Sequence, residues 1–165
     1  MPLLPFAALP NDARTWVFGA TDPIHSDGEA MLLDSVDEWL GEWKAHGQPL
    51  TCGREWREGR FLVVGVDQRA AGASGCSIDA LFHVLQTIQG GLGTSFLGGG
   101  RVFYRDAQDA VVCTDRTRLG EAPGISGSTP VFDTAITTAG EYRARFERPL
   151  SDSWHRELLP PGRQR

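Results

Sequence analysis

The sequence predicts an α+β fold in which an antiparallel sheet carries two helices on one of its faces. Along the chain, apolar residues recur with strand and helix spacing in the order strand, helix, strand, strand, helix, strand. The run Phe61–Val66 lacks polar alternation, so we expect both faces of that strand to be covered. This order is typical of the split βαβ, or ferredoxin-like, sandwich, in which the first and third strands are central.

The elements begin with an extended lead-in over residues 1–13, where three prolines oppose a helix. Residues 14–20, RTWVFGA, are rich in β-branched and aromatic side chains and predict the first strand. The first helix follows to about residue 45, with Ser26 and Glu29 as a capping box. A glycine and a proline just beyond residue 45 are typical of a helix end.

The rest of the expected core has four parts and a hairpin. These are a polar edge strand over 50–56, the apolar strand over 60–67, a second helix over 77–89, a glycine-rich loop over 90–100, and a strand over 101–106 with a hairpin partner at 110–114. A ribonuclease-H-like α/β sheet is the alternative, and the helix between the first two strands argues against it.

The last part of the chain predicts loops and short helices. Thr129 followed by Pro130 is typical of a helix start, as is Thr138 followed by Glu141. We therefore expect helices over about 130–137 and 139–147. The whole chain, 1–165, is predicted to be a single domain with a core over about 14–115 and a helical extension over about 116–158.

Composition excludes several classes of protein. The net charge of -5 gives no basic surface for nucleic acid. No apolar run is long enough to cross a membrane, and the first residues form a poor signal peptide. The three cysteines are far apart and match neither a disulfide framework nor a zinc pattern. These features predict a cytoplasmic protein with reduced thiols, no membrane partner and no nucleic-acid partner.

The loop from Gln68 to Gly75 is the predicted site. It leads from a buried strand into a helix, whose free N–H groups and dipole favour an anion. The neighbouring glycines would let a ligand approach the backbone. The order of elements should also bring the end of the strand over 101–106 to this edge. The candidate ligand-binding residues are Asp67, Gln68, Arg69, Ser74, Gly75, Ser77 and Arg105.

Cys76 and His46 are the candidate catalytic residues. Cys76 lies at the start of the second helix, a position that favours the thiolate form. The predicted topology brings the end of the first helix, and with it His46, to the same edge as a base for Cys76. A small structural cysteine is the competing interpretation. Asp67 has two readings as well, as a metal ligand or base, or as a cap for its own loop.

Several pieces together resemble a family of short, uncharacterised bacterial proteins of similar length. The pieces are WKAHG at 43–47, GVDQ at 65–68, SGCSID at 74–79, TPVF at 129–132 and SWH at 153–155. Such proteins are sometimes labelled ABC transporter ATPases. This sequence contradicts the label, because it contains no GxxxxGK[ST] loop and its lone Lys44 lies in the wrong helix. The resemblance implies an outline of the fold but no established activity, and it leaves the cofactor unknown.

Three functions remain open at this stage, and the residues do not decide whether the protein is an enzyme. The first is a domain that binds a small anionic ligand at the predicted site. The second is a non-enzymatic adaptor that assembles as a homodimer. The third is a metal-dependent hydrolase that uses Asp67 with a second carboxylate from Asp106 or Asp109.

Overall fold

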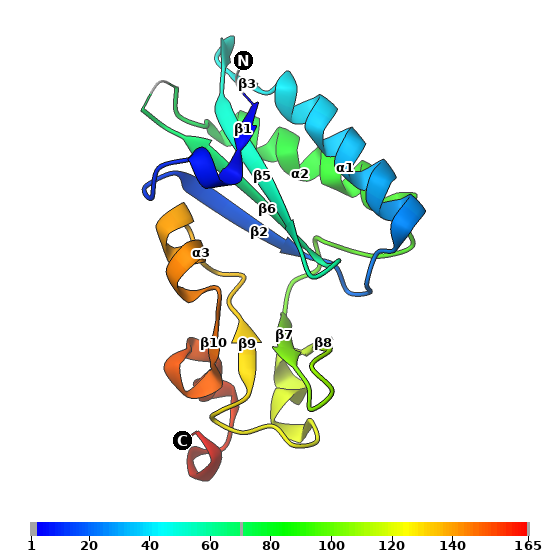
Figure 1. Cartoon of the computed structure of the whole chain (residues 1–165), viewed down its shortest axis with the longest axis vertical. Helices are drawn as coiled ribbons and strands as arrows, with labels where there is room; N and C mark the ends of the chain where they lie inside the picture. Colours follow the sequence, from blue (N-terminus) through cyan, green and yellow to red (C-terminus); the bar gives the residue numbers. More distant parts are fainter. Residues whose placement is uncertain (1–2, 70, 165) are drawn as a thin grey trace. The chain divides into compact units, whose positions relative to one another are not determined.

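The first sheet holds the elements that position the predicted site. The computed structural model describes residues 3–69 and 71–164 (Figure 1). Four strands form the sheet in the order β1-β5-β6-β2. Their bounds are β1 (Leu3–Pro5), β2 (Arg14–Gly19), β5 (Thr51–Arg57) and β6 (Phe61–Asp67). β6 is antiparallel to both β5 and β2, whereas β1 runs parallel to β5.

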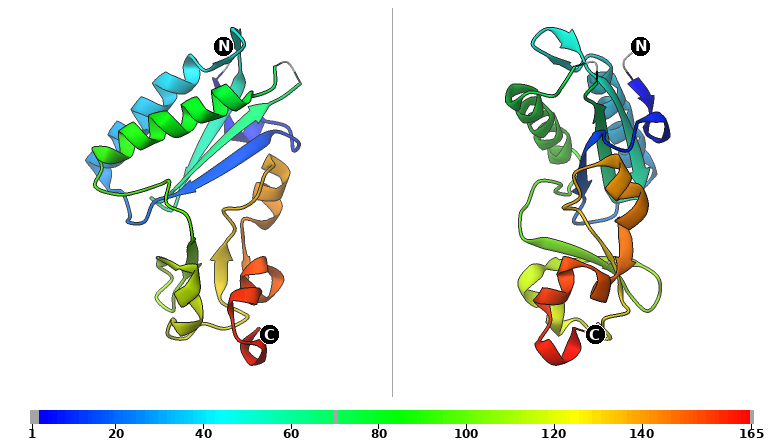
Figure 2. Two further views of the ribbon diagram at one scale, coloured as in Figure 1. Left: turned by 180° about the vertical axis from the view of Figure 1, so that it is seen from behind. Right: turned by 90° about the vertical axis from the view of Figure 1, so that its left-hand side faces the viewer.

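Two long helices, α1 (Ser26–Gly41) and α2 (Gly75–Gly90), lie side by side on one face of this sheet (Figures 1 and 2). Their apolar stripes meet alternate residues of the strands. The helix residues Leu32, Leu40, Leu81 and Leu85 pack with Leu62, Val64 and Val66 in one core. The opposite face is covered close to Gly65, where an added Cβ would lie 2.7 Å from Leu9 Cδ1. Both faces of β6 are therefore buried, as its sequence predicts.

The second sheet has the order β10-β9-β7-β8. Its strands are β7 (Arg101–Arg105), β8 (Val111–Asp115), β9 (Pro130–Phe132) and β10 (Glu147–Pro149). The remaining elements are the hairpin β3 (Lys44–Ala45) and β4 (Gln48–Pro49), the helix α3 (Ala139–Arg145), and the 3-10 helices η1 (Phe6–Ala8), η2 (Arg116–Glu121), η3 (Leu150–Asp152), η4 (Trp154–Leu158) and η5 (Pro161–Arg163).

The chain divides into two compact units. Unit 1 comprises residues 1–97 together with 136–142, and unit 2 comprises residues 98–135 together with 143–165. Unit 1 has its core between the first sheet and its two helices. Unit 2 has its own apolar cluster, which includes Val102, Tyr104, Leu119, Val131 and Leu150. The division does not follow the predicted boundary near residue 115.

The predicted mixed α+β class is confirmed, but the ferredoxin-like assignment is not. β2, α1, β5, β6 and α2 follow the expected order, with β6 between β5 and β2. The strand predicted over 101–106 is present as β7, and it pairs with β8 and β9 in the second sheet. β2 therefore forms an edge of the first sheet, not the central position that we predicted for it.

Helix boundaries differ from the sequence prediction in two places. α1 ends at Gly41, and the residues expected to continue it form the β3–β4 hairpin, with His46 and Gly47 at positive φ of 51° and 77° in its turn. Two successive residues at positive φ are typical of a tight hairpin turn. Pro130 begins β9 and not a helix, because a proline is tolerated at the first residue of a strand and Val131 and Phe132 favour extended backbone.

Of the three helix starts for which the sequence predicts a cap, the one at Thr138 is confirmed. The Thr138 hydroxyl accepts a hydrogen bond from the Glu141 amide at 3.1 Å and donates to the Glu141 carboxylate at 3.3 Å, at the start of α3. The Ser26 prediction is wrong, since His25 is the N-cap of α1 and its side chain makes no capping hydrogen bond.

Candidate functional site

The loop between β6 and α2 joins a fully buried strand to the start of a helix of 16 residues. A capping box fixes the helix start. The Ser77 amide donates to Ser74 Oγ at 3.2 Å, and the Ser74 amide donates to Ser77 Oγ at 2.7 Å. This pattern uses a serine at N3 in place of the usual Glu or Gln. Ser77 is buried and Ser74 half-buried, so the cap is protected from solvent.

Two first-turn amides of α2 remain available for a ligand. The Ser77 amide is bound by the cap, and the Ile78 amide donates to the Ser74 carbonyl at 3.0 Å. For Gly75 and Cys76, the described residues provide no acceptor. Both residues are exposed. Apart from the chain neighbours of Gly75 and the backbone of α2 itself, no atom of the described residues lies within 4 Å of the position that a Cβ on Gly75 would occupy. The helix therefore presents two N–H donors and its positive dipole end to open space.

Asp67 ends β6 and binds Arg69. Its carboxylate accepts from the Arg69 amide at 3.0 Å and from the Arg69 side chain at 2.7 to 3.1 Å. These bonds from the Arg69 side chain and amide hold the pKa of Asp67 below its ordinary value. Asp67 thus caps its own loop, as the competing interpretation of the sequence predicts. The Arg69 side chain is 70% exposed, so it remains within reach of solvent.

The other loop residue in the predicted ligand set, Gln68, is exposed. Its Oε1 lies 3.4 Å from the position of a Cβ built on Gly72, so the side chain folds back over the loop. A Cβ at position 72 would therefore make an ordinary van der Waals contact with the Gln68 side chain.

Trp43 ties the chain beyond α1 to the start of α2. Its indole Nε1 donates to the Ser77 carbonyl at 2.9 Å, and its ring is buried against Trp39 and Trp16. This contact places the segment after α1 next to the first turn of α2, as the chain direction suggests. The helical spacing of Trp39 and Trp43 predicts core packing, with a ligand-stacking wall as the alternative, but spacing alone does not show where an indole N–H points.

The two candidate catalytic residues are both exposed. Cys76 is the second residue of α2, and His46 lies in the β3–β4 turn. No hydrogen bond joins them within the described part of the chain. A catalytic pairing of the two stays a prediction.

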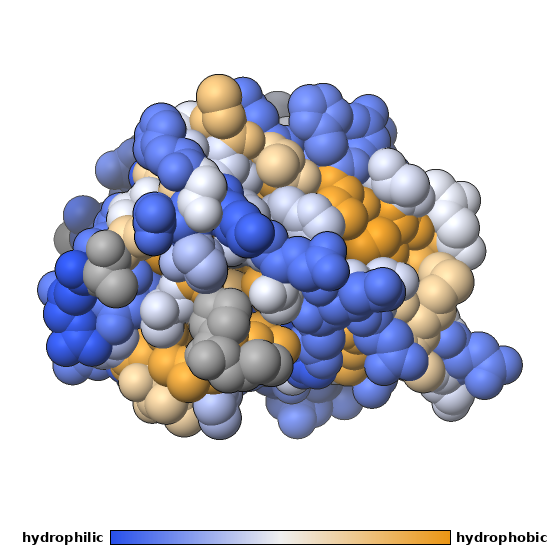
Figure 3. Space-filling view, turned by 90° about the horizontal axis from the view of Figure 1, so that it is seen from above, coloured by the Kyte–Doolittle hydropathy of each residue, from blue (hydrophilic) through white to orange (hydrophobic). Residues whose placement is uncertain are grey.

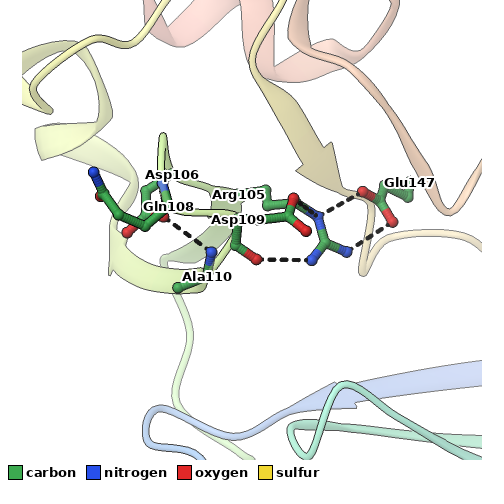
Figure 4. Close-up of polar contacts among 6 residues, drawn as sticks. All are labelled: Arg105, Asp106, Gln108, Asp109, Ala110 and Glu147. Atoms are coloured by element: carbon green, nitrogen blue, oxygen red, sulfur yellow. Dashed lines mark hydrogen bonds and ion pairs between the residues drawn. The ribbon is translucent and has the colours of Figure 1, made fainter.

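Arg105, the last residue of the predicted ligand set, belongs to unit 2, and its part in the site stays a prediction. It lies at the end of β7 in the second sheet, where its Nε and Nη2 donate to the Glu147 carboxylate at 2.9 and 3.0 Å (Figure 4). Its Nη1 also donates to the Asp109 carbonyl at 3.1 Å. The guanidinium therefore fixes the β7–β8 turn to β10 and has a structural role in unit 2.

The carboxylates proposed as metal ligands have structural partners of their own. Asp106 accepts from the Gln108 and Ala110 amides, both at 2.9 Å, and so shapes the β7–β8 turn (Figure 4). Asp109 has a positive φ of 66° in the same turn. No group of three or more His, Cys, Asp or Glu side chains suited to a metal ion occurs among residues 3–69 and 71–164.

Comparison with known proteins adds no family or activity. No family model matches the chain, and neither the curated proteins nor the solved structures include a significant match. The resemblance based on the GVDQ and SGCSID pieces stays a prediction. None of the helices in the described part of the chain is both long enough and apolar enough to span a bilayer.

Proposed function

We propose that this protein binds a small anionic ligand at the β6–α2 loop. One observation carries the proposal: the amides of Gly75 and Cys76 have no acceptor among the described residues at the exposed start of α2. A ligand oxyanion there would accept hydrogen bonds from both amides and would lie at the positive end of the helix dipole.

The surroundings support an anion of small size. The capping box already holds the backbone in the binding conformation, so ordering the loop would cost little further entropy. The side chain of Arg69 is largely exposed at the start of the loop and supplies positive charge, although Asp67 neutralises part of it. The free thiol of Cys76 lies on the same first turn and is available as a probe of occupancy.

A proline at position 75 tests the proposal directly. Gly75 is the first helical residue, where proline is well tolerated, and Ser74 already has the extended φ and ψ of -92° and 166° that a following proline requires. Gly75→Pro removes one donor amide without removing the cap. Gly75→Ala is the matched control, because it restricts the backbone but keeps the amide.

We would titrate inorganic phosphate, sulfate and acetate into each protein and follow the backbone amide resonances. Wild type and Gly75→Ala should show saturable shifts at position 75 and at Cys76 and Ser77, and bound anion should slow alkylation of Cys76. A hydrogen bond to a charged group contributes about 1.5–3 kcal/mol, so Gly75→Pro should lose about tenfold or more in affinity. Equal affinity in the proline and alanine variants would refute the site.

Assembly as a homodimer is the second candidate function. Two large apolar side chains on the helical layer are exposed, Met31 by 43% and Phe82 by 39%. Figure 3 shows other apolar residues reaching the surface between hydrophilic ones. Such side chains favour a protein contact only weakly when they are scattered. Sedimentation over a wide concentration range, with Phe82→Ser as the variant, would test this function independently of anion binding.

The metal-dependent hydrolase has the least support, because a metal ion at Asp67 would have to displace the ion pair with Arg69.

We also propose that the protein is cytoplasmic. This proposal rests on cysteine usage, since Cys52 and Cys76 are both free thiols.

A further inference from the structure

A second place for a ligand lies wholly within unit 2. It is a hollow of about 520 Å³ bordered by the segment after β9, the end of α3, β10, η3 and η4. The residues that border it are Asp133, Ala135, Arg145, Arg148, Ser151, Asp152, Ser153, Trp154, Arg156 and Glu157. Most of these side chains are polar, unlike those of the apolar core of the same unit.

A buried carboxylate organises one wall of this hollow. Asp133, whose side chain is only 7% exposed, accepts from Arg148 Nη2 at 2.8 Å, from Trp154 Nε1 at 3.1 Å and from the Ala135 amide at 3.0 Å. All of these groups border the hollow. The arrangement fixes a guanidinium and an indole before any ligand arrives, which lowers the entropic cost of binding.

Two buried polar residues, Asp133 and Ser153, border the hollow, and the buried His155 is bonded to one of them. Asp133, Ser153 and His155 are three of the seven buried polar or charged residues among those described. Ser153 Oγ lies 2.6 Å from His155 Nδ1, and the imidazole stacks on Trp154 with ring centroids 4.0 Å apart. Burying polar groups costs stability, and such clusters occur preferentially at functional sites.

Arg148 keeps unused hydrogen-bonding capacity. A guanidinium has five N–H donors, and within the described residues Arg148 uses one of them, in its bond to Asp133. Its Nε is buried without an acceptor. Arg145 and Arg156 also border the hollow, are exposed, and have no ion-pair partner in the described ranges. The protein therefore leaves guanidinium donors from α3, β10 and η4 for another molecule.

We propose that the hollow binds a small carboxylate. Guanidinium groups match the planar, two-oxygen geometry of a carboxylate. Charge balance favours a carboxylate over a phosphate: Asp133 neutralises Arg148, and the exposed Asp152 and Glu157 offset Arg145 and Arg156. The hollow thus has little net positive charge for a dianion, whereas a monoanion needs only local donors.

The test uses the full chain and four probes: acetate, benzoate, glycine and inorganic phosphate. The readout is the indole N–H resonance of Trp154, assigned with Trp154→Phe, because that N–H is bound to Asp133 in the wall of the hollow. The test variant is the double substitution Arg145→Gln and Arg156→Gln, both at exposed positions. Arg118→Gln is the matched control, since Arg118 is also an exposed arginine of unit 2 but does not border the hollow.

At least one carboxylate should shift the Trp154 resonance in a saturable way and bind more tightly than phosphate. The double variant should bind that carboxylate about tenfold more weakly or worse, and Arg118→Gln should bind it as wild type does. No saturable shift with any carboxylate, an equal loss in Arg118→Gln, or tighter binding of phosphate would each overturn the proposal. None of these results depends on the Gly75 variants, so the two sites succeed or fail separately.

Discussion

The buried imidazole of His155 predicts that acid weakens this protein before its carboxylates are protonated. His155 is 1% exposed. Burial lowers the pKa of His155 from 6.5 to about 4, the charge of Asp133 opposes this shift, and that of Arg148 adds to it. In the native state the ring is therefore neutral through most of the range in which the unfolded chain takes up a proton.

The sign and size of the effect follow from proton linkage. Between pH 6.5 and 4 the unfolded state binds more protons at this residue, so stability falls as the pH falls. Each pH unit in that window lowers the free energy of unfolding by about 1.4 kcal/mol. A native pKa of about 4 in place of 6.5 therefore corresponds to a loss of roughly 3 kcal/mol in the free energy of unfolding by pH 4. The loss should be complete below the native pKa, with no further contribution from this group.

Urea unfolding across this pH range, for wild type and His155→Asn, measures the effect. The asparagine keeps a polar group for Ser153 but does not titrate, so the variant's free energy of unfolding should fall less steeply between pH 6.5 and 4. Asp67 and Asp115 also have lowered pKa values, so they change the free energy of unfolding only at lower pH, below the ordinary carboxyl pKa of 3.8. Their effect is the same in both proteins. Parallel stability curves for the two proteins would refute the reasoning, as would an imidazole resonance of His155 that titrates near pH 6.5.

Three further predictions concern unit 1. Gly53→Ala should destabilise the protein by about 1–3 kcal/mol in urea unfolding, because an added Cβ would overlap the backbone carbonyl of Leu4 in β1, which cannot rotate away. Unchanged stability would mean that β1 moves freely. Trp43→Phe should cost about 1 kcal/mol through loss of the bond to the Ser77 carbonyl, and hydrogen exchange should rise at the start of α2 and not at its end. Iodoacetamide with mass spectrometry should modify exposed Cys76 well before Cys52, since burial raises the pKa of Cys52 to about 12; equal rates would contradict the burial of Cys52.

Local patterns predicted much of unit 1. The helical spacing of apolar residues identified α1 and α2, and the apolar run at 61–66 identified the buried strand β6. The tight turn between β5 and β6 is another local feature, with Glu58 and Gly59 at positive φ of 62° and 64°. These features depend on neighbours in sequence, which is why a single sequence reveals them.

Long-range partners were not predictable in the same way. β7 has the composition of a strand, but nothing in its own residues distinguishes pairing with β9 from pairing with β2. The network in unit 2 joins Asp133 to Arg148 and Trp154, 15 and 21 residues away. No periodic pattern links such positions, so the sequence alone does not indicate which side chains lie beside His155.

The polypeptide leaves unit 1 after residue 97 and returns to it for residues 136–142. In this returning segment, the Thr137 carbonyl accepts a hydrogen bond from the Thr15 amide of β2 at 2.9 Å. The Tyr142 ring packs edge-on against Phe6, and the two ring centroids are 5.4 Å apart. During synthesis on the ribosome, the amino-terminal part must wait for these later residues before its packing is finished. A shortened protein that stops at residue 97 would lack this closing piece, so cutting the gene there would not yield an intact first half.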